Sequence, residues 1–258
     1  TVVMTAVFWP VIREDLPVLG KRLWWLFIVG GSGFALFNIV LYSAFRHGAS
    51  VTHVSLITAL IPLMVLLVDV FFLRGRAHPL QWLGVALSFL GVVWVVSGGK
   101  PFSILDQGIA RGDALAFVTS AIYAAYSLAL RHAPKVHWAS LLWAMCVAAV
   151  IVSVPFYGYE VIAQGFRAPS WQAWLLLLYV SIFIAIVSKL FYMESVIAIG
   201  ASRAALTMNL LPVFGALLGV AFFADEQLSA HVIVALLLVG GGIGLSEWGA
   251  ARQRRLRI

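Results

Sequence analysis

The sequence predicts an all-α integral membrane protein built as an inverted repeat. Two observations carry this prediction: the composition, and a self-similarity at an offset of 150 residues. Of the 258 residues, 63% are hydrophobic and only 10% are charged, whereas soluble domains carry about 25% charged residues. The chain is therefore expected to lie in a lipid bilayer.

Eight apolar segments are long enough to cross a bilayer, which takes about 20 helical residues. They cover residues 22–46, 50–74, 79–97, 112–132, 138–158, 171–198, 201–223 and 230–248. The opening apolar stretch, TVVMTAVFWPVI, is too short to span. The segments are also too long for the strands of a membrane barrel and do not alternate with period two. Membrane-spanning helices are therefore predicted.

The repeat appears when the chain is laid over itself with a shift of 150 residues, which aligns about 55 positions without a gap. The shift pairs tyrosines 42 and 192, prolines 62 and 212, and glycines 91 and 241. Because the two copies lie an odd number of spans apart, they cross the membrane in opposite directions. Such inverted repeats are typical of secondary transporters.

The repeat also sets the expected domain organisation. Residues 1–97 form the first repeat, 98–111 an outer connecting loop, 112–248 the second repeat and 249–258 a basic cytoplasmic tail. The same shift lays the span at 138–158 over the opening fragment, and the span at 112–132 over positions before residue 1. We expect two five-helix bundles and ten helices in the intact protein, with the first helix and part of the second absent here.

Lysine and arginine predict that both termini face the cytoplasm of a bacterial inner membrane. If the final segment ARQRRLRI lies inside, the inner loops hold twelve of these residues and the outer loops hold four. An excess of this kind marks cytoplasmic loops. The net charge of +7 comes from residues scattered in short loops, so no nucleic-acid partner is expected.

Two runs of sequence resemble one family of transporters. The run ASRAALTMNLLPVFGALLGVAFFADEQLSAHVIVALLLVGGGIGL looks like the last two helices of the drug/metabolite transporter superfamily, EamA type. The family's markers there correspond to Ala201, Ser202, Pro212, Glu226 and Gly241. Residues 112–133 resemble the helix that opens the family's second half. One departure is Arg76, which stands where the first repeat of the family usually carries a glutamate.

The resemblance implies ten helices, a central substrate cavity and export of small metabolites by alternating access. Among bacterial members the chain looks most like the aromatic amino-acid exporters, so aromatic or large neutral amino acids are the expected substrates. The alternative is an exporter of drugs or of sugar- or nucleotide-linked metabolites. A phosphate-bearing substrate favours several cationic side chains in the cavity, and Lys189 is the one cation found there.

An enzyme is not expected. The string GGSG, residues 30–33, matches the GxSG string of rhomboid-type intramembrane proteases. A serine nucleophile needs a histidine at similar depth, and each histidine falls near a predicted helix end or loop. Close helix packing is the preferred interpretation. No catalytic residue, metal or cofactor is expected, and the expected partners are the substrate and the bilayer. The oligomeric state is not defined, and a monomer is compatible with the sequence.

The repeat-related prolines mark the candidate cavity. Pro62 and Pro212 lack an amide hydrogen, which leaves the carbonyls of Thr58 and Met208 without their usual donors. Within a bilayer, freed backbone groups are buried in protein or line a cavity; a simple packing kink is the competing interpretation. With polar and aromatic side chains of other spans added, the predicted cavity residues are Asn38, Tyr42, Thr58, Pro62, Tyr123, Trp143, Tyr192, Met208, Asn209 and Pro212.

Two charged residues lie well inside predicted spans, Asp69 and Lys189. A charge at such depth is a functional candidate by default. We expect both at the inner mouth of the cavity, paired with each other or with neighbours. The competing interpretation is that the lysine extends its ammonium to the membrane surface.

Overall fold

The computed structural model describes residues 1–108, 110–166, 168–222 and 230–255, and the regular structure in this part of the chain is entirely helical. The elements are α1 (Val2–Gly20), α2 (Leu23–Gly30), η1 (Gly31–Leu36), α3 (Phe37–Arg46), α4 (Val51–Thr58), α5 (Ile61–Phe71), α6 (Pro79–Val96), η2 (Pro101–Gln107), α7 (Arg111–Ala129), η3 (Leu130–His132), α8 (Trp138–Gln164), α9 (Trp171–Tyr179), η4 (Val180–Ser188), α10 (Lys189–Ile199), α11 (Ala201–Leu206), η5 (Thr207–Asn209), α12 (Leu210–Phe222) and α13 (Ala230–Arg255). Within these residues, 8 helical stretches are long and apolar enough to cross a membrane. The predicted all-α membrane architecture and its eight spans are confirmed.

The helices form two compact units, which are described separately. The first unit contains Thr1–Ile39 and Ala129–Ala198, and the second contains Val40–Leu128 and Ile199–Ile258. Each unit therefore combines a segment from either predicted repeat. The repeat boundaries and the ten-helix count stay predictions.

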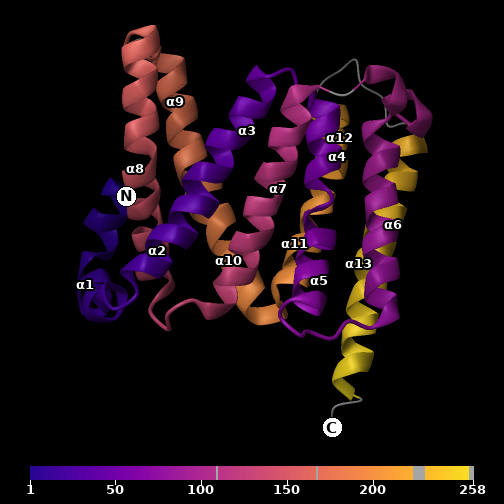
Figure 1. Cartoon of the computed structure of the whole chain (residues 1–258), viewed down its shortest axis with the longest axis horizontal. Helices are drawn as coiled ribbons and strands as arrows, with labels where there is room; N and C mark the ends of the chain where they lie inside the picture. The colour runs from indigo at the N-terminus through magenta and orange to yellow at the C-terminus, as the bar shows by residue number, and fades with distance from the viewer. Residues whose placement is uncertain (109, 167, 223–229, 256–258) are drawn as a thin grey trace. The chain divides into compact units, whose positions relative to one another are not determined.

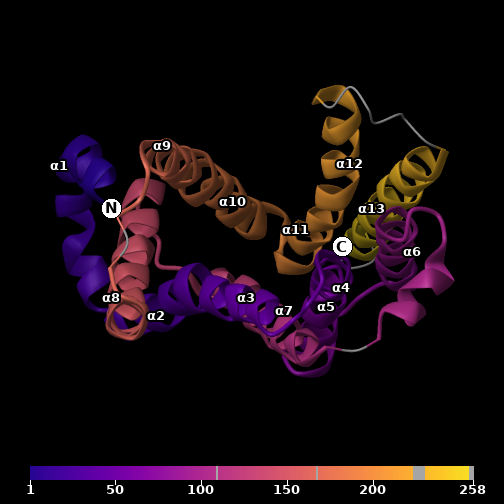
Figure 2. The same ribbon diagram turned by 90° about the horizontal axis from the view of Figure 1, so that it is seen from above.

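In the second unit, α6 and α13 lie side by side and run antiparallel (Figures 1 and 2). Gly84 faces Gly242 and Ser246, whereas Gly91, later in α6, faces Val239, which is earlier in α13. This order of contacts shows that the two helices run in opposite directions. A Cβ atom on Gly84 would lie only 2.4 Å from the carbonyl oxygen of Gly242. Small residues permit this approach, as they do between membrane helices generally. The two helices correspond to each other under the shift of 150 residues.

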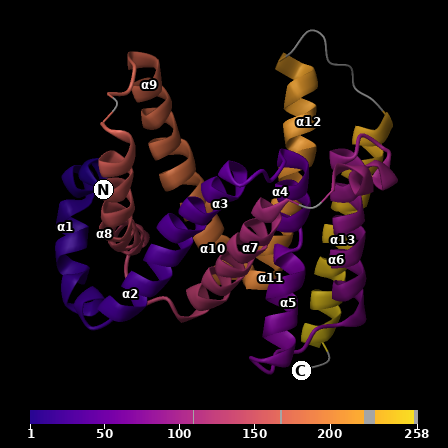
Figure 3. The ribbon, with the colours of Figure 1, turned by 45° about the horizontal axis from the view of Figure 1, so that its top comes forward.

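Two of the spans in the second unit are interrupted. Helix α4 ends at Thr58 and α5 begins at Ile61, with the two helices following one another along the same span (Figure 3). The other interruption is the 3₁₀ turn η5, between α11 and α12. Pro62 lies in the first turn of α5, where a missing amide hydrogen costs nothing. Pro62 is thus located where a new helix starts, rather than within a kinked continuous helix.

In the first unit, α1 and α2 pack against α8. The glycines of the GGSG string make this packing close: a Cβ on Gly30 would lie 2.8 Å from the Cα of Met145, and one on Gly31 would lie 2.8 Å from Cγ2 of Val152. The π-helical segments η1 and η4 both belong to this unit. Their positions, residues 31–36 and 180–188, overlap under the shift of 150 residues.

The helices differ from expectation at both ends of the described chain. Helix α1 continues through the predicted inner loop to Gly20, and α13 continues into the basic tail as far as Arg255. Tertiary contacts explain the first difference, because Ile12 and Leu19 are buried and Asp15 Oδ2 accepts a hydrogen bond from His137 N at 3.0 Å. In the second, the guanidinium of Arg252 lies 4.3 Å from the ring centroid of Trp248. Counting apolar residues gives no information on either contact.

Candidate functional site

Four of the predicted cavity residues meet at one pocket in the second unit. Thr58 ends α4, Met208 and Asn209 lie in η5, and Pro212 is in the first turn of α12. Ser55, Ala59 and Leu211 complete the lining of a cavity of about 310 Å³. Ligand sites measure about 300–1,000 Å³, so the pocket has room for a small solute.

The pocket brings together the two interruptions. Thr58 and Met208 correspond under the shift of 150 residues, and so do Ala59 and Asn209. Sequence analysis missed Ser55, Ala59 and Leu211. Two of them carried a signal: Ser55 lies one turn before Thr58 on the same helix face, and Ala59 is the counterpart of Asn209.

The polar side chains of the pocket are oriented by hydrogen bonds. The hydroxyl of Thr58 donates within its own helix, to the carbonyl of Val54 at 2.8 Å and that of Ser55 at 3.1 Å. Asn209 is only 1% exposed, and its Nδ2 donates to Oγ of Ser88 at 3.0 Å. Ser88 lies on α6 and is fully buried. Sequence analysis missed Ser88, and no pattern in the sequence links it to Asn209.

Helix α7 contacts the first interruption through a side-chain hydrogen bond. Oγ of Ser120 donates to the carbonyl of Ile57 at 3.3 Å, as well as to its own helix. Tyr123 follows on the same face; it is buried, and its ring centroid lies 5.4 Å from that of Tyr126. The hydrogen bond from Ser120 thus goes to the carbonyl of Ile57, the residue before Thr58, and not to the Thr58 carbonyl that the sequence analysis considered. Tyr123 is not among the residues that line the pocket.

A hydrogen bond and an ion pair between side chains fix the starts of the two half-helices that lead to the pocket. At the third residue of α4, Nδ1 of His53 lies 2.9 Å from Oδ2 of Asp113, which also accepts from Ala110 N. At the third residue of α11, Arg203 forms a two-pronged ion pair with Glu247 on α13. His53 and Arg203 are 150 residues apart. Sequence analysis missed these pairs, although the repeat places a basic side chain at both positions.

The other predicted cavity residues lie elsewhere. Pro62 is buried but is not part of the pocket lining. Tyr42 is 66% exposed. Asn38 and Tyr192 belong to the first unit, where Nδ2 of Asn38 donates to the carbonyl of Phe34 at 2.8 Å. The predicted aromatic residues therefore do not contribute to the lining of this pocket.

Lys189 lies in the first unit, at the junction of η4 and α10. Its Nζ donates to the carbonyl of Gly33 at 3.2 Å and lies 4.9 Å and 5.6 Å from the ring centroids of Phe34 and Phe37. Gly33 belongs to η1, and the wide turns of a π-helix alter the usual pairing of carbonyls. The Lys189 ammonium thus lies against η1, the π-helical segment that corresponds to η4 under the shift of 150 residues.

Asp69 lies in the second unit, in the last turn of α5. Its carbonyl accepts from Gly75 N at 2.8 Å, where the chain folds back toward α6. Asp69 makes a further interaction and is half-buried. The proposed role of Asp69 and Lys189 at an inner mouth stays a prediction.

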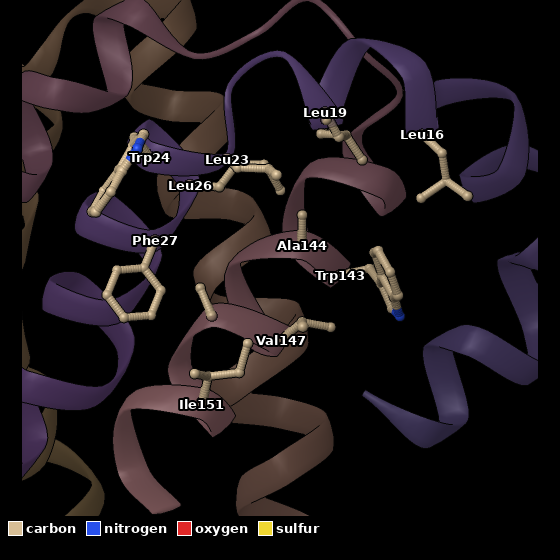
Figure 4. Close-up of a pocket in the computed structure, with 12 residues that line it drawn as sticks. Leu16, Leu19, Leu23, Trp24, Leu26, Phe27, Trp143, Ala144, Val147 and Ile151 are labelled. Atoms are coloured by element: carbon tan, nitrogen blue, oxygen red, sulfur yellow. The ribbon is translucent and has the colours of Figure 1, made fainter.

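A larger pocket, of about 570 Å³, lies in the first unit between α1, α2 and α8 (Figure 4). Its lining is apolar apart from the indole nitrogens of Trp24 and Trp143, and Nε1 of Trp143 donates to Oγ1 of Thr5 at 2.8 Å. Such a surface provides dispersion contacts but no directional recognition of a polar solute. We therefore take the smaller pocket at the helix interruptions as the candidate substrate site.

The described residues contain no group of three or more His, Cys, Asp or Glu side chains arranged to hold a metal ion. Glu226, one of the positions that carry the family resemblance, lies outside the described residues.

Repeated membrane-spanning helices, with a pocket where two of them are interrupted, define a multi-pass α-helical membrane protein. The EamA-like transporter family matches residues 1–97 and 110–247, and the chain belongs to that family. A relative from Bacillus subtilis strain 168, described as the uncharacterized transporter YyaM, is 23% identical over 235 residues, which cover 88% of this chain and 76% of the relative. One solved crystal structure matches with a TM-score of 0.70 and 19% identity, over 87% of this chain and 78% of the other. That likeness bears on the fold alone.

Proposed function

We propose that this protein is a secondary transporter that exports small neutral metabolites, principally amino acids, across the bacterial inner membrane by alternating access. The observation that carries the proposal is the convergence of two interrupted helices, one from each predicted repeat, on one uncharged pocket. Interrupted helices that meet at the membrane midplane form substrate sites in secondary transporters. The relative described as a transporter is consistent with this role.

The inverted repeat is part of the proposal, and two features support it. Helices α6 and α13 occupy corresponding positions and run in opposite directions, as an inverted pair must. The two interruptions correspond as well, and both contribute to the pocket. Both features support the proposal that this pocket is the substrate site, because transporters of this architecture bind substrate at the repeat interface.

The pocket's chemistry favours amino acids over the alternative substrates. Its lining combines two hydroxyls and an amide with alanine, leucine, methionine and proline, and contains no charged side chain among the described residues. A sugar phosphate or nucleotide would call for arginine or lysine. The preference for aromatic side chains rests on the family resemblance, so aliphatic and aromatic amino acids both belong in the test.

Transport is tested in proteoliposomes by counterflow of labelled phenylalanine, tryptophan and leucine, with and without a pH gradient. Leu211, which is 64% exposed and lines the pocket, provides an obstructing variant. We expect Leu211→Trp to reduce counterflow at least tenfold because the indole fills the pocket. The matched control is Leu218→Trp, on the same helix but outside the pocket, which should transport normally. The proposal is wrong if the wild type moves none of these amino acids, or if both variants behave alike.

The proposed topology places both ends of the chain in the cytoplasm, because twelve inner and four outer basic residues result from that orientation. The orientation is measured with single-cysteine variants in a Cys146→Ala background. One variant replaces Phe102, which is 81% exposed in η2, and the other replaces Gln253 in α13. An impermeant maleimide added to intact spheroplasts should label position 102 and leave position 253 unlabelled until the membrane is broken. The reverse pattern would show the opposite orientation.

A further inference from the structure

The pocket's hydrogen-bonding groups are unevenly divided between donors and acceptors. The Thr58 hydroxyl has one hydrogen, which is engaged with the carbonyls of Val54 and Ser55. Its oxygen still carries lone pairs, so toward the pocket Thr58 is an acceptor. The orientation of this hydroxyl thus follows from its own helix.

Asn209 also provides a hydrogen-bond acceptor, and a residue on another helix positions it. Its amide nitrogen donates one of its two hydrogens to the fully buried Ser88, and this bond sets the position of the amide oxygen, an acceptor with two lone pairs. No hydrogen bond to that oxygen is found among the described residues. Ser88 is therefore a positioning residue, because it fixes which end of the amide is available.

The remaining groups extend this imbalance. Ser55 has a hydroxyl that can accept as well as donate, and Met208 contributes a thioether, a weak acceptor. Pro212 has no amide hydrogen to offer. Helix α4 ends in the pocket at Thr58 and α12 begins there at Leu210, so the partial charges of these two helix ends have opposite signs and the side-chain oxygens decide the balance. The pocket is thus rich in acceptors and contains no carboxylate within the described residues.

We propose that this pocket recognises the primary ammonium group of its substrate, through the oxygens of Ser55, Thr58 and Asn209. An ammonium group has three N–H donors and no acceptor, so it matches in number the three side-chain oxygens that line this pocket. This inference rests on the proposed transport function and adds to it the group that is required for binding. The carboxylate of an amino acid is then dispensable, and primary amines are substrates too.

The test compares four compounds as competitors of labelled phenylalanine in proteoliposomes: phenylalanine, phenethylamine, N-acetylphenylalanine and 3-phenylpropionate. A leucine series, with isoamylamine, N-acetylleucine and 4-methylpentanoate, is run in parallel against labelled leucine. Phenethylamine and isoamylamine should compete within about threefold of their amino acids. The acetylated and deaminated compounds should compete at least tenfold more weakly. Equal competition by the N-acetyl or deaminated compounds would overturn the inference, whereas transport of neither amino acid would overturn the proposed function.

Variants assign the preference to these residues. Thr58→Val keeps the shape of the side chain but removes the oxygen, and it should reduce the amine's advantage over the N-acetyl compound at least fivefold. Thr58→Ser should keep the advantage. Ser88→Ala frees the amide of Asn209 and should have the same effect as Thr58→Val. This selectivity ratio is measured on folded, active protein, so a general loss of stability does not change it. An unchanged ratio in both Thr58→Val and Ser88→Ala would show that these oxygens do not recognise the ammonium.

Discussion

Replacing Gly84 by alanine is expected to destabilise the protein by about 3 kcal/mol, at the upper end of the usual cost of overpacking. The added methyl carbon would lie 2.4 Å from the carbonyl oxygen of Gly242 and 2.8 Å from the amide nitrogen of Ser246. Both are backbone atoms, so no side-chain rotation relieves the contact and the two helices must separate. The expected result is a lower midpoint of thermal unfolding in detergent and a smaller monodisperse fraction on size exclusion.

The control for this prediction is the same substitution where the helix surface is open. An added carbon on Gly240 or Gly244, both on α13, meets nothing within 4 Å. Alanine is favoured over glycine within a helix by about 1 kcal/mol, so Gly240→Ala and Gly244→Ala should be neutral or stabilising. If Gly84→Ala is as stable as these two, the close approach of α6 and α13 is wrong.

This crossing also affects the candidate site. An added carbon on Gly242 would lie 2.7 Å from the amide nitrogen of Ser88, the residue that orients Asn209. Separation of the two helices would therefore move the partner of the pocket's amide. Gly84 and Gly242 allow the close approach of α6 and α13, and this approach helps to hold Ser88 where it accepts the hydrogen bond from Asn209.

The sequence predicted well those features that depend on one helix alone. Hydropathy placed the eight spans, since crossing a bilayer fixes both length and apolarity. The paired prolines located both interruptions, since proline acts on its own backbone. Four of the proposed cavity residues proved to be neighbours because they lie within one turn of those interruptions.

Features that depend on the packing of one helix against another were not predicted. Ser88 is separated from Asn209 by 121 residues, and the packing of α6 against η5 and α12 brings the two together. The aromatic side chains of Tyr42 and Trp143 were assigned to one cavity by residue type, but the structure places one on an exposed surface and the other beside an apolar pocket. Residue type indicates what a side chain can contact, while the rotation of its helix decides what it does contact.

Replacing Pro212 by alanine is expected to abolish transport while leaving the protein as stable as the wild type, or more stable. Alanine restores an amide hydrogen four residues after Met208, so its carbonyl gains the donor that proline denies it. The 3₁₀ turn η5 can then become α-helical, joining α11 to α12. The turns differ, at 3.0 and 3.6 residues, so the conversion rotates Met208 and Asn209 and removes Asn209 from Ser88.

The control is Pro155→Ala, because Pro155 lies inside α8, is exposed and belongs to the first unit. That substitution restores an amide hydrogen in the same way, but away from the pocket, so it should raise the midpoint of unfolding and leave transport unchanged. We expect counterflow by Pro212→Ala to fall at least tenfold, with an unfolding midpoint no lower than that of the wild type. Normal transport by a folded Pro212→Ala variant would show that the interruption shapes packing only. Loss of folding would show instead that the 3₁₀ turn is needed for stability. The expected combination, a stable protein that no longer transports, separates a functional interruption from a structural one.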